Sequence, residues 1–491
     1  MAERYDQARA DRGCRERRLI KGGYPLPPRK RRVKNKIVVA SAGYWWTSCQ
    51  NNATNAVKLN NGGFNNNNKT NSNNVFCAYE IMSNREWCSI GDVYAAYLDC
   101  KKRKSKSIHY AQFAANEAAN IYDLWKDLNE RTYTIGYSDA FCVTRPKVRE
   151  VFAAQFRDRI VHHLVMLRLL PIFEAAFIND TYNCRVGKGT DYGIRRVAHF
   201  MEKHPQGWVL KCDIRCFFMT IDKQRLADML ARFIAERYQG EDKEPIQWLV
   251  RMIVLHRPEL RCIRKGDVHL WDVLPAGKTL FGTGGKTGLA IGNLTSQIFA
   301  NYYLLPLDQW LASVPGVEYG RYVDDFVLVA DSADRLKGLL PQIRTFLRER
   351  LAIELHPSKV YLQPVRHGVK FLGSAIKQGR IYAGNRTVGN IKTLVSEYAE
   401  IRNKERYIEK FAQRYNSYMG YLIHRNTYGI RWAVWNMVDE QTRKYVYLAG
   451  NLAVMQVRSE YKERNKLLKQ YSHGKKNFCR KRLRRGEPRV C

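Results

Sequence analysis

The sequence predicts an α+β protein, with buried strands in the middle of the chain and helices before and after them. Residues 147–177 place apolar side chains at helical spacing, and residues 391–418 do so again in a basic segment. Residues 207–218 read as a buried strand entered from a glycine turn, and residues 319–331 as a hairpin. A hydrophobic share of 45% is that of a globular chain, so most of the 491 residues should fold.

The first 80 residues differ in composition from the rest. They contain the basic run Arg29–Lys36 and a block in which half of the residues between Asn51 and Asn74 are asparagine. Asparagine side chains compete with the backbone for hydrogen bonds, so such a run specifies neither helix nor sheet. We therefore expect residues 1–80 to form a largely disordered, Asn-rich extension.

The ends of several later elements can be placed from single residues. Ser89 is a candidate N-cap for a helix that runs through Cys100. The helical pattern over 147–177 is expected to break at Pro171, because proline lacks a backbone N–H. The basic tail over 456–491 is expected to fray.

Charge is the strongest signal in the composition. The chain has 83 Lys and Arg residues against 46 Asp and Glu residues, a formal net charge of +37. Such an excess indicates a polyanionic partner through counterion release from phosphates, and a membrane surface is a weaker alternative. We find no apolar run of spanning length and no signal peptide, so no membrane association is expected. The twelve cysteines never form a CxxC pair, which argues against a zinc site and for reduced thiols in a cytoplasm.

Three aspartates carry the chemistry that the sequence predicts. Asp324 and Asp325 lie between two apolar stretches, where a hairpin would place both carboxylates at the tip of its turn. Asp213 ends an apolar strand, and a charge that leaves a buried strand must be paired or metal-bound. Adjacent carboxylates repel each other, and a divalent cation relieves that repulsion. The three side chains indicate a two-metal site, in which ions about 3.5–4 Å apart activate a hydroxyl and stabilise a leaving pyrophosphate.

Other residues near these aspartates have simpler interpretations. Asp222 is interpreted as a helix cap, and Asp308 as a structural polar group. A helix should begin between Leu294 and Ser296, after the glycines Gly284, Gly285, Gly288 and Gly292. A glycine-rich entry to a helix allows close approach by an anionic or base-paired ligand.

The order of these segments resembles motifs A to E of reverse transcriptases. The acidic strand with FF comes first, then the glycine segment with SQ, then YVDD, LHPSK and VKFLG. Upstream, TRPKVREVFAAQFRDRIVHH and FINDTYNCRVGKGT resemble the fingers motifs of the same family. The resemblance covers Tyr94 to Leu422. It implies a right-hand polymerase fold with fingers, a palm built on an antiparallel sheet, and a helical thumb.

The resemblance also implies how the chain is divided. After the extension over 1–80, N-terminal helices and fingers would occupy 81–204. The palm, with part of the fingers, would occupy 205–385, and the thumb 386–455. The basic tail would follow over 456–491.

The metal site that the resemblance implies has four contributors. They are the side chains of Asp213, Asp324 and Asp325, with Asp325 in a supporting role, and the backbone carbonyl of Ile214. Two Mg²⁺ ions are the implied cofactor, with Mn²⁺ as a substitute. Lys359 matches the lysine of motif D, which can act as a general acid for pyrophosphate.

Substrate contacts follow from the same motifs. Residues implied to contact the incoming nucleotide are Arg185, Lys188, Phe218 and Gln297. Phe218 would exclude a ribose 2′-hydroxyl, and the charges of Arg185 and Lys188 suit a triphosphate. Residues implied to position template and primer are Ile291, Gly292, Tyr322 and Gly373.

One segment narrows the resemblance further. Ala290–Gln297 reads AIGNLTSQ, with an apolar residue before Gly292 and a glutamine at its end. This motif and the segment from Asn416 to Arg431 resemble the reverse transcriptases of diversity-generating retroelements. The implied enzyme is cytoplasmic, encoded by a bacterium or phage, and copies a template RNA into cDNA with errors at adenines. Its implied partners are template RNA, the cDNA primer, dNTPs and a small basic accessory protein.

The asparagine block gains a second interpretation from this resemblance. Adenine-rich AAY codons specify asparagine, and the segment from Gly43 to Ile81 resembles a translated template repeat of a lectin-like variable region. Residues 1–80 would then be a by-product of coding sequence and dispensable for polymerisation. A low-complexity tail is the alternative. Codons without an imperfect repeat elsewhere in the locus would contradict the first interpretation.

Three alternatives stay open at this point. Antiphage-defence, retron and intron-maturase enzymes share the fold, although motif B argues against the last two and no HNH-type Cys/His cluster or RNase H constellation is evident. An RNA-binding protein that keeps the fold without activity would be expected to lack one of the carboxylates. A basic structural protein with a chance YVDD would not explain five motifs in order.

Overall fold

The structure is a computed structural model. Backbone and side chains are described for residues 86–102, 107–144 and 147–462, and the backbone alone for five short strands before them. The chain divides into two compact units, Met1–Asn84 and Arg85–Cys491, and each is described by itself. Within the described part of the chain, no disulfide joins the cysteines and no helix is both long and apolar enough to cross a membrane.

The first unit contains a five-stranded sheet in the order β1-β2-β5-β3-β4. Its strands are β1 (Val38–Val39), β2 (Trp45–Ser48), β3 (Asn55–Asn60), β4 (Gly63–Asn68) and β5 (Phe76–Tyr79). The remainder of 1–80 lies outside the described residues, so the expectation of a largely disordered extension stays a prediction. β3 and β4 pair antiparallel on either side of Asn61 and Gly62 in the sequence, and Asn-Gly is a dipeptide strongly favoured in two-residue hairpin turns.

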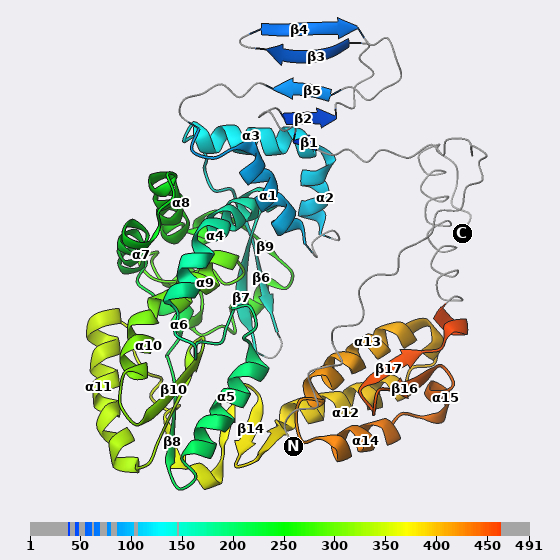
Figure 1. The fold of residues 1–491 in the computed structure, drawn as a ribbon. Helices are drawn as coiled ribbons and strands as arrows, with labels where there is room; N and C mark the ends of the chain where they lie inside the picture. Colours follow the sequence, from blue (N-terminus) through cyan, green and yellow to red (C-terminus); the bar gives the residue numbers. More distant parts are fainter. Residues whose placement is uncertain are drawn as a thin grey trace, which may run out of the picture. The chain divides into compact units, whose positions relative to one another are not determined.

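The second unit is built on a four-stranded antiparallel sheet in the order β10-β11-β8-β12. Two of its strands, β8 and β10, are labelled in Figure 1. Its strands are β8 (Trp208–Asp213), β10 (Val317–Tyr322), β11 (Asp325–Ala330) and β12 (Tyr361–Pro364). β8 and the β10–β11 hairpin confirm the strands predicted within 207–218 and 319–331. Valines of β8 and β11 form a buried cluster with the apolar side of helix α5 (Thr190–Lys203). Helix α11 (Ala333–Leu351) packs against β8, β11 and β12.

Two three-stranded sheets carry further segments that the sequence linked to a site. One has the order β7-β6-β9, with β6 (Ser138–Val143), β7 (Arg149–Ala154) and β9 (Cys262–Lys265). The other is an antiparallel meander of β13 (Val369–Phe371), β14 (Ser374–Lys377) and β15 (Arg380–Ala383).

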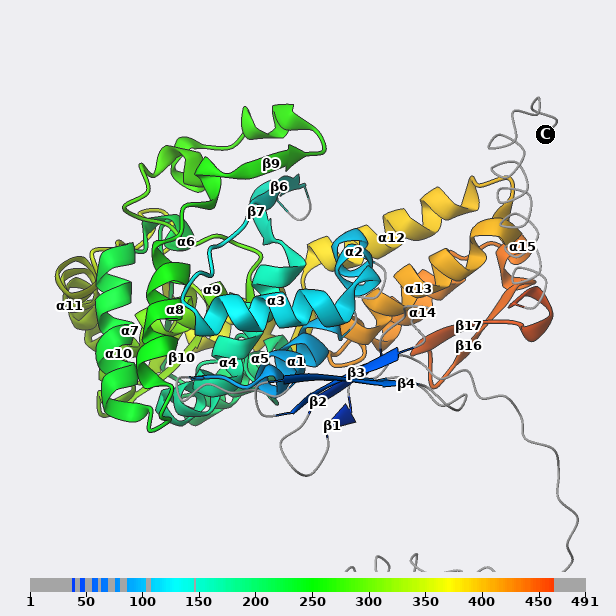
Figure 2. The same cartoon turned by 90° about the horizontal axis from the view of Figure 1, so that it is seen from above.

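Helices make up most of the rest of the unit. The α-helices between residues 90 and 312, apart from α5, are α1 (Ile90–Lys101), α2 (Ile108–Ala115), α3 (Glu117–Asn129), α4 (Phe156–Ala176), α6 (Phe217–Thr220), α7 (Lys223–Arg237), α8 (Lys243–Leu255), α9 (Leu294–Tyr303) and α10 (Leu305–Ala312). The 3₁₀ turns are η1 (Pro258–Leu260), η2 (Val268–Trp271), η3 (Ala276–Lys278), η4 (Leu280–Gly282) and η5 (Val365–His367). α7 packs against α8, and α1 against α4 (Figure 2).

Two helix caps confirm their predictions. Ser89 caps α1 through a capping box, because its side chain accepts from the Asp92 N–H and the Asp92 carboxylate accepts from the Ser89 N–H. Asp222 caps α7, where its carboxylate accepts from the Arg225 N–H at 2.7 Å.

The segment over 147–177 differs from its prediction in two ways. Residues Arg149–Ala154 form strand β7 rather than a helix, because they pair with β6 along their whole length. Helix α4 then runs through Pro171 to Ala176 without ending there. Pro171 has no N–H to donate to the carbonyl of Leu167. Leu167 is 45% exposed, so water can hydrogen-bond to that carbonyl instead.

The C-terminal part of the unit has a core of its own. Its elements are α12 (Asn385–Ala399), α13 (Lys404–Leu422), α14 (Tyr428–Asn436), α15 (Glu440–Arg443), β16 (Val446–Ala449) and β17 (Val454–Val457). Side chains from α12, α13, α14 and both strands share one buried cluster. The segment predicted as a helical thumb therefore also contains a β-hairpin, and residues 463–491 lie outside the described residues.

Two glycines make room for one buried ring at the edge of the central sheet. Tyr182 is fully buried, and its ring lies against Gly193 of α5 and Gly320 of β10. A Cβ at Gly193 would lie 2.6 Å from the Tyr182 ring, and a Cβ at Gly320 would lie 2.2 Å from the Tyr182 hydroxyl. Both approaches are shorter than a van der Waals contact, so α5 and β10 pack closely only because neither position has a side chain.

We predict opposite effects for the same substitution at two helical glycines. Gly193→Ala should lower the free energy of unfolding by about 1–3 kcal/mol, because the added methyl group overpacks Tyr182. Gly338→Ala, in an exposed part of α11 where a Cβ meets no atom within 4 Å, should raise it by about 0.5–1 kcal/mol. Urea unfolding of the full chain measures both, and equal effects would contradict the packing described here.

Candidate active site

The central sheet brings the predicted aspartates together at one end. Asp213 is the last residue of β8 and Asp325 the first of β11, and the two are register partners across the strands. The Ile214 N–H donates to the Asp324 carbonyl at 3.1 Å, which ties the turn before β11 to the end of β8. The predicted turn with both carboxylates at its tip is thus present in the structure.

The turn itself contains an unfavourable backbone conformation. Val323 has φ +57°, in the left-handed region that β-branched residues rarely adopt. Its N–H donates to Asn183 Oδ1 at 2.9 Å, and its carbonyl accepts from Arg321 Nη1 at 2.7 Å. These two side chains hold the peptide that places Asp324 at the tip.

A fully buried ion pair lies beneath the turn. Arg321 and Asp308 are both inaccessible to solvent, with Nε to Oδ1 at 2.7 Å and Nη2 to Oδ2 at 2.5 Å. Tyr319 donates to Asp308 at 2.7 Å, and Arg321 Nη2 also donates to the Asn301 carbonyl at 3.2 Å. Asp308 therefore has the structural role that the sequence predicts.

Burial and mutual repulsion disfavour the charged forms of the carboxylates at this site. Burial and the neighbouring charge of Asp213 raise the pKa of Asp324 above its usual range. Burial also raises the pKa of Asp325 to about 6, although Lys211 opposes the shift. The Oδ1 atom of Asp325 is buried and has no hydrogen-bond partner in the structure.

Two lysines provide the counter-ions that are present. Lys359 Nζ lies 2.9 Å from Asp213 Oδ1, and Lys211 Nζ lies 3.0 Å from Asp325 Oδ2. Lys359 is the predicted general acid, and the structure places it directly against a predicted metal ligand. Lys211 was not predicted. It could have been found from its position two residues before Asp213, because this spacing puts both side chains on the same face of a strand.

The site matches a divalent ion in its chemistry but not in its present side-chain arrangement. Within the described part of the chain, no three His, Cys, Asp or Glu side chains are grouped as metal ligands. Lys359 and Lys211 engage two of the three carboxylates. Hard oxygen donors, raised pKa values and an unpartnered buried oxygen nevertheless fit Mg²⁺. Ile214, the predicted backbone ligand, is buried next to Asp213 and bridges to Leu355.

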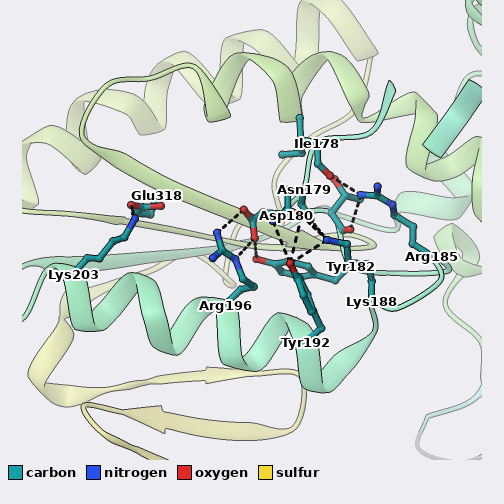
Figure 3. A network of polar contacts seen from close by, with 11 residues as sticks. Ile178, Asn179, Asp180, Tyr182, Arg185, Lys188, Tyr192, Arg196, Lys203 and Glu318 are labelled. Carbon is teal, nitrogen blue, oxygen red and sulfur yellow. Dashed lines mark hydrogen bonds and ion pairs between the residues drawn. The ribbon is translucent and has the colours of Figure 1, made fainter. Parts of the chain in front are cut away.

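Arg185 and Lys188 belong to a separate polar network (Figure 3). The Arg185 side chain is only 7% exposed, with Nε 2.8 Å from Glu174 Oε2 and Nη1 donating to the Ile178 and Thr181 carbonyls. Lys188 Nζ donates to Asn179 Oδ1 at 2.6 Å and to the Tyr192 hydroxyl at 3.1 Å. In this structure both cations are committed to partners in the last turn of α4, the loop before α5 and the first turn of α5. Their contact with a nucleotide stays a prediction.

Arg149 is a basic residue that the sequence analysis did not select. It is the first residue of β7, it is exposed, and its charge acts to lower the pKa of Asp324. Arg149 was not selected because the segment over 147–177 was predicted to be helical, whereas Arg149 begins strand β7.

The predicted gate residue Phe218 lies close to two of the predicted template residues, Ile291 and Gly292. Phe218 and Ile291 pack against the same small core, and the Leu289 N–H donates to the Phe218 carbonyl at 2.7 Å. The Phe152 N–H of β7 donates to the Ile291 carbonyl at 2.8 Å. Gly292 has φ +128°, and a Cβ there would lie 2.8 Å from the Phe152 carbonyl, so only glycine fits this approach.

Gln297 and Tyr322 share a neighbour that was not predicted. The thiol of Cys184 hydrogen-bonds to Gln297 Oε1. Burial, together with Cys184, raises the pKa of Tyr322. Cys184 has φ +56°, so the loop that carries Arg185 places this thiol beside two predicted contact residues.

Gly373 lies in the two-residue turn between β13 and β14, where Phe371 pairs with Ser374. Leu372 has φ +48° and Gly373 has φ +77°, the combination typical of a tight hairpin turn. The Gly373 carbonyl accepts from the Tyr421 hydroxyl at 2.6 Å and from the Gly384 N–H at 2.8 Å.

Comparison with known families agrees with this geometry. A family described as "Reverse transcriptase (RNA-dependent DNA polymerase)" matches residues 144–376, which include the three aspartates and Lys359. This part of the chain is a reverse transcriptase domain. By its family, the reverse transcriptase domain is an RNA-dependent DNA polymerase.

Individual proteins that are similar to this chain are distant from it in sequence. Protein YkfC of Escherichia coli strain K12 is 23% identical over 291 residues, which cover 52% of this chain and 69% of that protein. A telomerase from Candida albicans, in complex with a fragment of telomeric RNA, is 11% identical with a TM-score of 0.36 over 63% of this chain and 59% of that one. An apo telomerase from Candida tropicalis is 13% identical with a TM-score of 0.39, over 64% of this chain and 57% of that one.

We predict that removing one partner of the buried ion pair lowers the free energy of unfolding more than replacing both partners by apolar residues. Asp308→Ala should lower the free energy of unfolding by about 3–5 kcal/mol, because Arg321 is then buried without a counter-ion. Glu318→Ala removes the half-exposed pair with Lys203 and should cost at most about 1 kcal/mol. Urea unfolding of the full chain measures both. A double variant, Asp308→Leu with Arg321→Met, should be less destabilised than Asp308→Ala, and the reverse order would refute the explanation.

Proposed function

We propose that this chain copies RNA into DNA at the end of the central sheet, with Asp213, Asp324 and Asp325 as its acidic centre. The observation that supports the proposal is the pairing of Asp325 with Asp213 across adjacent strands, next to a turn held in a strained conformation. Strain retained at one turn is typical of functional sites. The residues concerned all lie within the part of the chain that matches the reverse transcriptase family.

In the proposed site, Asp213, Asp324 and the Ile214 carbonyl would hold Mg²⁺, with Asp325 supporting them. Bound Mg²⁺, or Mn²⁺ in its place, would supply charge stabilisation for the attacking hydroxyl and the leaving pyrophosphate. Lys359 lies beside Asp213 and would release that carboxylate when an ion binds. Its ammonium group would then be available to give a proton to pyrophosphate.

The residues around the acidic centre would select and orient the nucleotide. Phe218 would restrict the sugar, while Ile291 and Gly292 would contact the template from the cluster that they share with β7. Arg149 is our candidate for charge compensation of the triphosphate, because it already acts on Asp324. Arg185 and Lys188 would join it only if their present partners are exchanged for phosphate oxygens.

We further propose that the enzyme is of the diversity-generating type. The support is the sequence of motif B, Ala290–Gln297, and the thumb-like segment from Asn416 to Arg431. The partners would be template RNA, a cDNA primer, dNTPs and a small basic accessory protein. The fingers, palm and thumb would occupy 81–204, 205–385 and 386–455. Antiphage-defence, retron and maturase enzymes remain the alternatives within the family.

We predict that Asp324→Asn abolishes DNA synthesis while RNA binding persists. The substitution removes a charge from the acidic centre, so primer extension should fall by at least about 10²-fold. Filter binding of template RNA should stay near the wild-type value, since a net charge of +37 changes little. Asp334→Asn, at a 90% exposed carboxylate of α11, is the matched control and should extend primers normally. Extension by Asp324→Asn would refute the site.

We predict that sequenced cDNA products carry errors concentrated opposite template adenines. The test is primer extension on the RNA encoded next to this reading frame, with manganese-free buffer so that ion substitution does not lower fidelity. An Ile291→Gln variant should reduce the adenine bias, because it replaces the apolar residue before Gly292 on which the proposed diversity-generating type depends. Errors spread evenly over the four template bases would contradict the diversity-generating type and leave the polymerase proposal intact.

A further inference from the structure

One buried arginine joins three parts of the chain that are far apart in sequence. Arg425 follows α13 in the segment His424–Thr427, and its side chain is only 1% exposed. A buried guanidinium is stable only when its donors are satisfied. The hydrogen-bond partners of Arg425 therefore show which segments of the chain its side chain links.

Every nitrogen of the Arg425 guanidinium has a different partner. Nε donates to Ser374 Oγ at 2.8 Å, and Nη2 donates to Asp191 Oδ1 at 2.8 Å. Nη1 donates to the Tyr421 carbonyl, and the guanidinium carbon lies 3.4 Å from the centre of the Tyr421 ring. The side chain thus bridges the β13–β14 turn, the first turn of α5 and the end of α13.

The β13–β14 turn is held by the same group of residues. Tyr421 donates its hydroxyl to the Gly373 carbonyl at 2.6 Å and lies 3.0 Å from Ser374 Oγ. Asn426, the next residue after Arg425, exchanges two hydrogen bonds with Ile381 of β15, at 2.8 and 3.0 Å. The turn around Gly373 is therefore anchored by the end of α13 and by the segment that follows it.

The other end of the bridge lies beside the predicted nucleotide loop. Asp191 stands in the first turn of α5, three residues after Lys188, and His424 also approaches its carboxylate at 4.0 Å. Its neighbour Tyr192 accepts from Lys188 and lies under the Lys188 ammonium, 4.2 Å from the ring centre. A displacement of α5 at Asp191 would be passed directly to this loop.

We propose that Arg425 is a positioning residue that fixes the primer-contacting turn at Gly373 relative to the nucleotide loop before α5. This inference rests on the proposed function, because it takes Gly373 and Lys188 to contact primer and nucleotide. Arg425 touches neither substrate and acts through Ser374, Tyr421 and Asp191. Loss of the bridge should weaken the binding of both substrates and change the rate at saturation little.

The test compares Arg425→Gln, Asp191→Asn and the double variant in the full chain, on a DNA primer annealed to an RNA template. Each single variant should raise both the primer–template Kd and the KM for dNTP by about tenfold, because the Gly373 turn and the nucleotide loop are then no longer held relative to each other. kcat at saturation should stay near the wild-type value. The double variant should be no worse than Arg425→Gln alone, because that substitution already removes the partner of Asp191.

Two further variants keep the outcome decisive. Lys203→Gln removes another ion pair of α5, with Glu318 at 2.8 Å, and should change neither constant (Figure 3). If Arg425→Gln does not fold, Tyr421→Phe removes only the hydroxyl bound to Gly373 and should still weaken primer binding. If the Arg425, Asp191 or Tyr421 variants keep the wild-type Kd for primer–template and the wild-type KM for dNTP, the inference about Arg425 is wrong, and the proposed function is unaffected. A wild-type protein that extends no primer would overturn the proposed function instead.

Discussion

The end of the central sheet that carries the three aspartates depends on the buried pair between Arg321 and Asp308. The Arg321 side chain donates both to the Asp308 carboxylate and to the carbonyl of Val323. Val323 has a positive φ, a backbone conformation that valine rarely adopts without such support. Two buried charges become favourable only when further hydrogen bonds satisfy them, which Tyr319 and Asn301 do here. The unfavourable turn is thus maintained by a pair that cannot move without exposing a charge.

The acidic centre is assembled from segments that are distant in the chain. Asn183 holds the Val323 N–H with its side chain and accepts from Asn301 with its carbonyl, so one residue links the turn to α9. The cluster around Phe218 and Ile291 also takes side chains from β6, β7, β9 and the segment 271–281. The carbonyls of Phe218, Ile291 and Gly373 each accept a hydrogen bond from a different part of the chain.

The sequence predicted what is determined locally. The strands around Asp213 and Asp324, the caps at Ser89 and Asp222 and the buried role of Asp308 depend on residue type and immediate neighbours, and the structure has them. The strand at Arg149 was missed because its pairing partner lies elsewhere in the chain. The commitments of Arg185, Lys211 and Arg425 depend on tertiary contacts, which no periodicity reveals.

The two lysines at the acidic centre also join the aspartates into one coupled set of charges. Lys211 Nζ lies 3.0 Å from Asp325 Oδ2, and Lys359 Nζ lies 2.9 Å from Asp213 Oδ1. Burial raises the pKa of both Asp324 and Asp325, whereas Lys359 acts to lower the first and Lys211 the second. A change at either lysine therefore alters the ionisation of an aspartate on a neighbouring strand or turn.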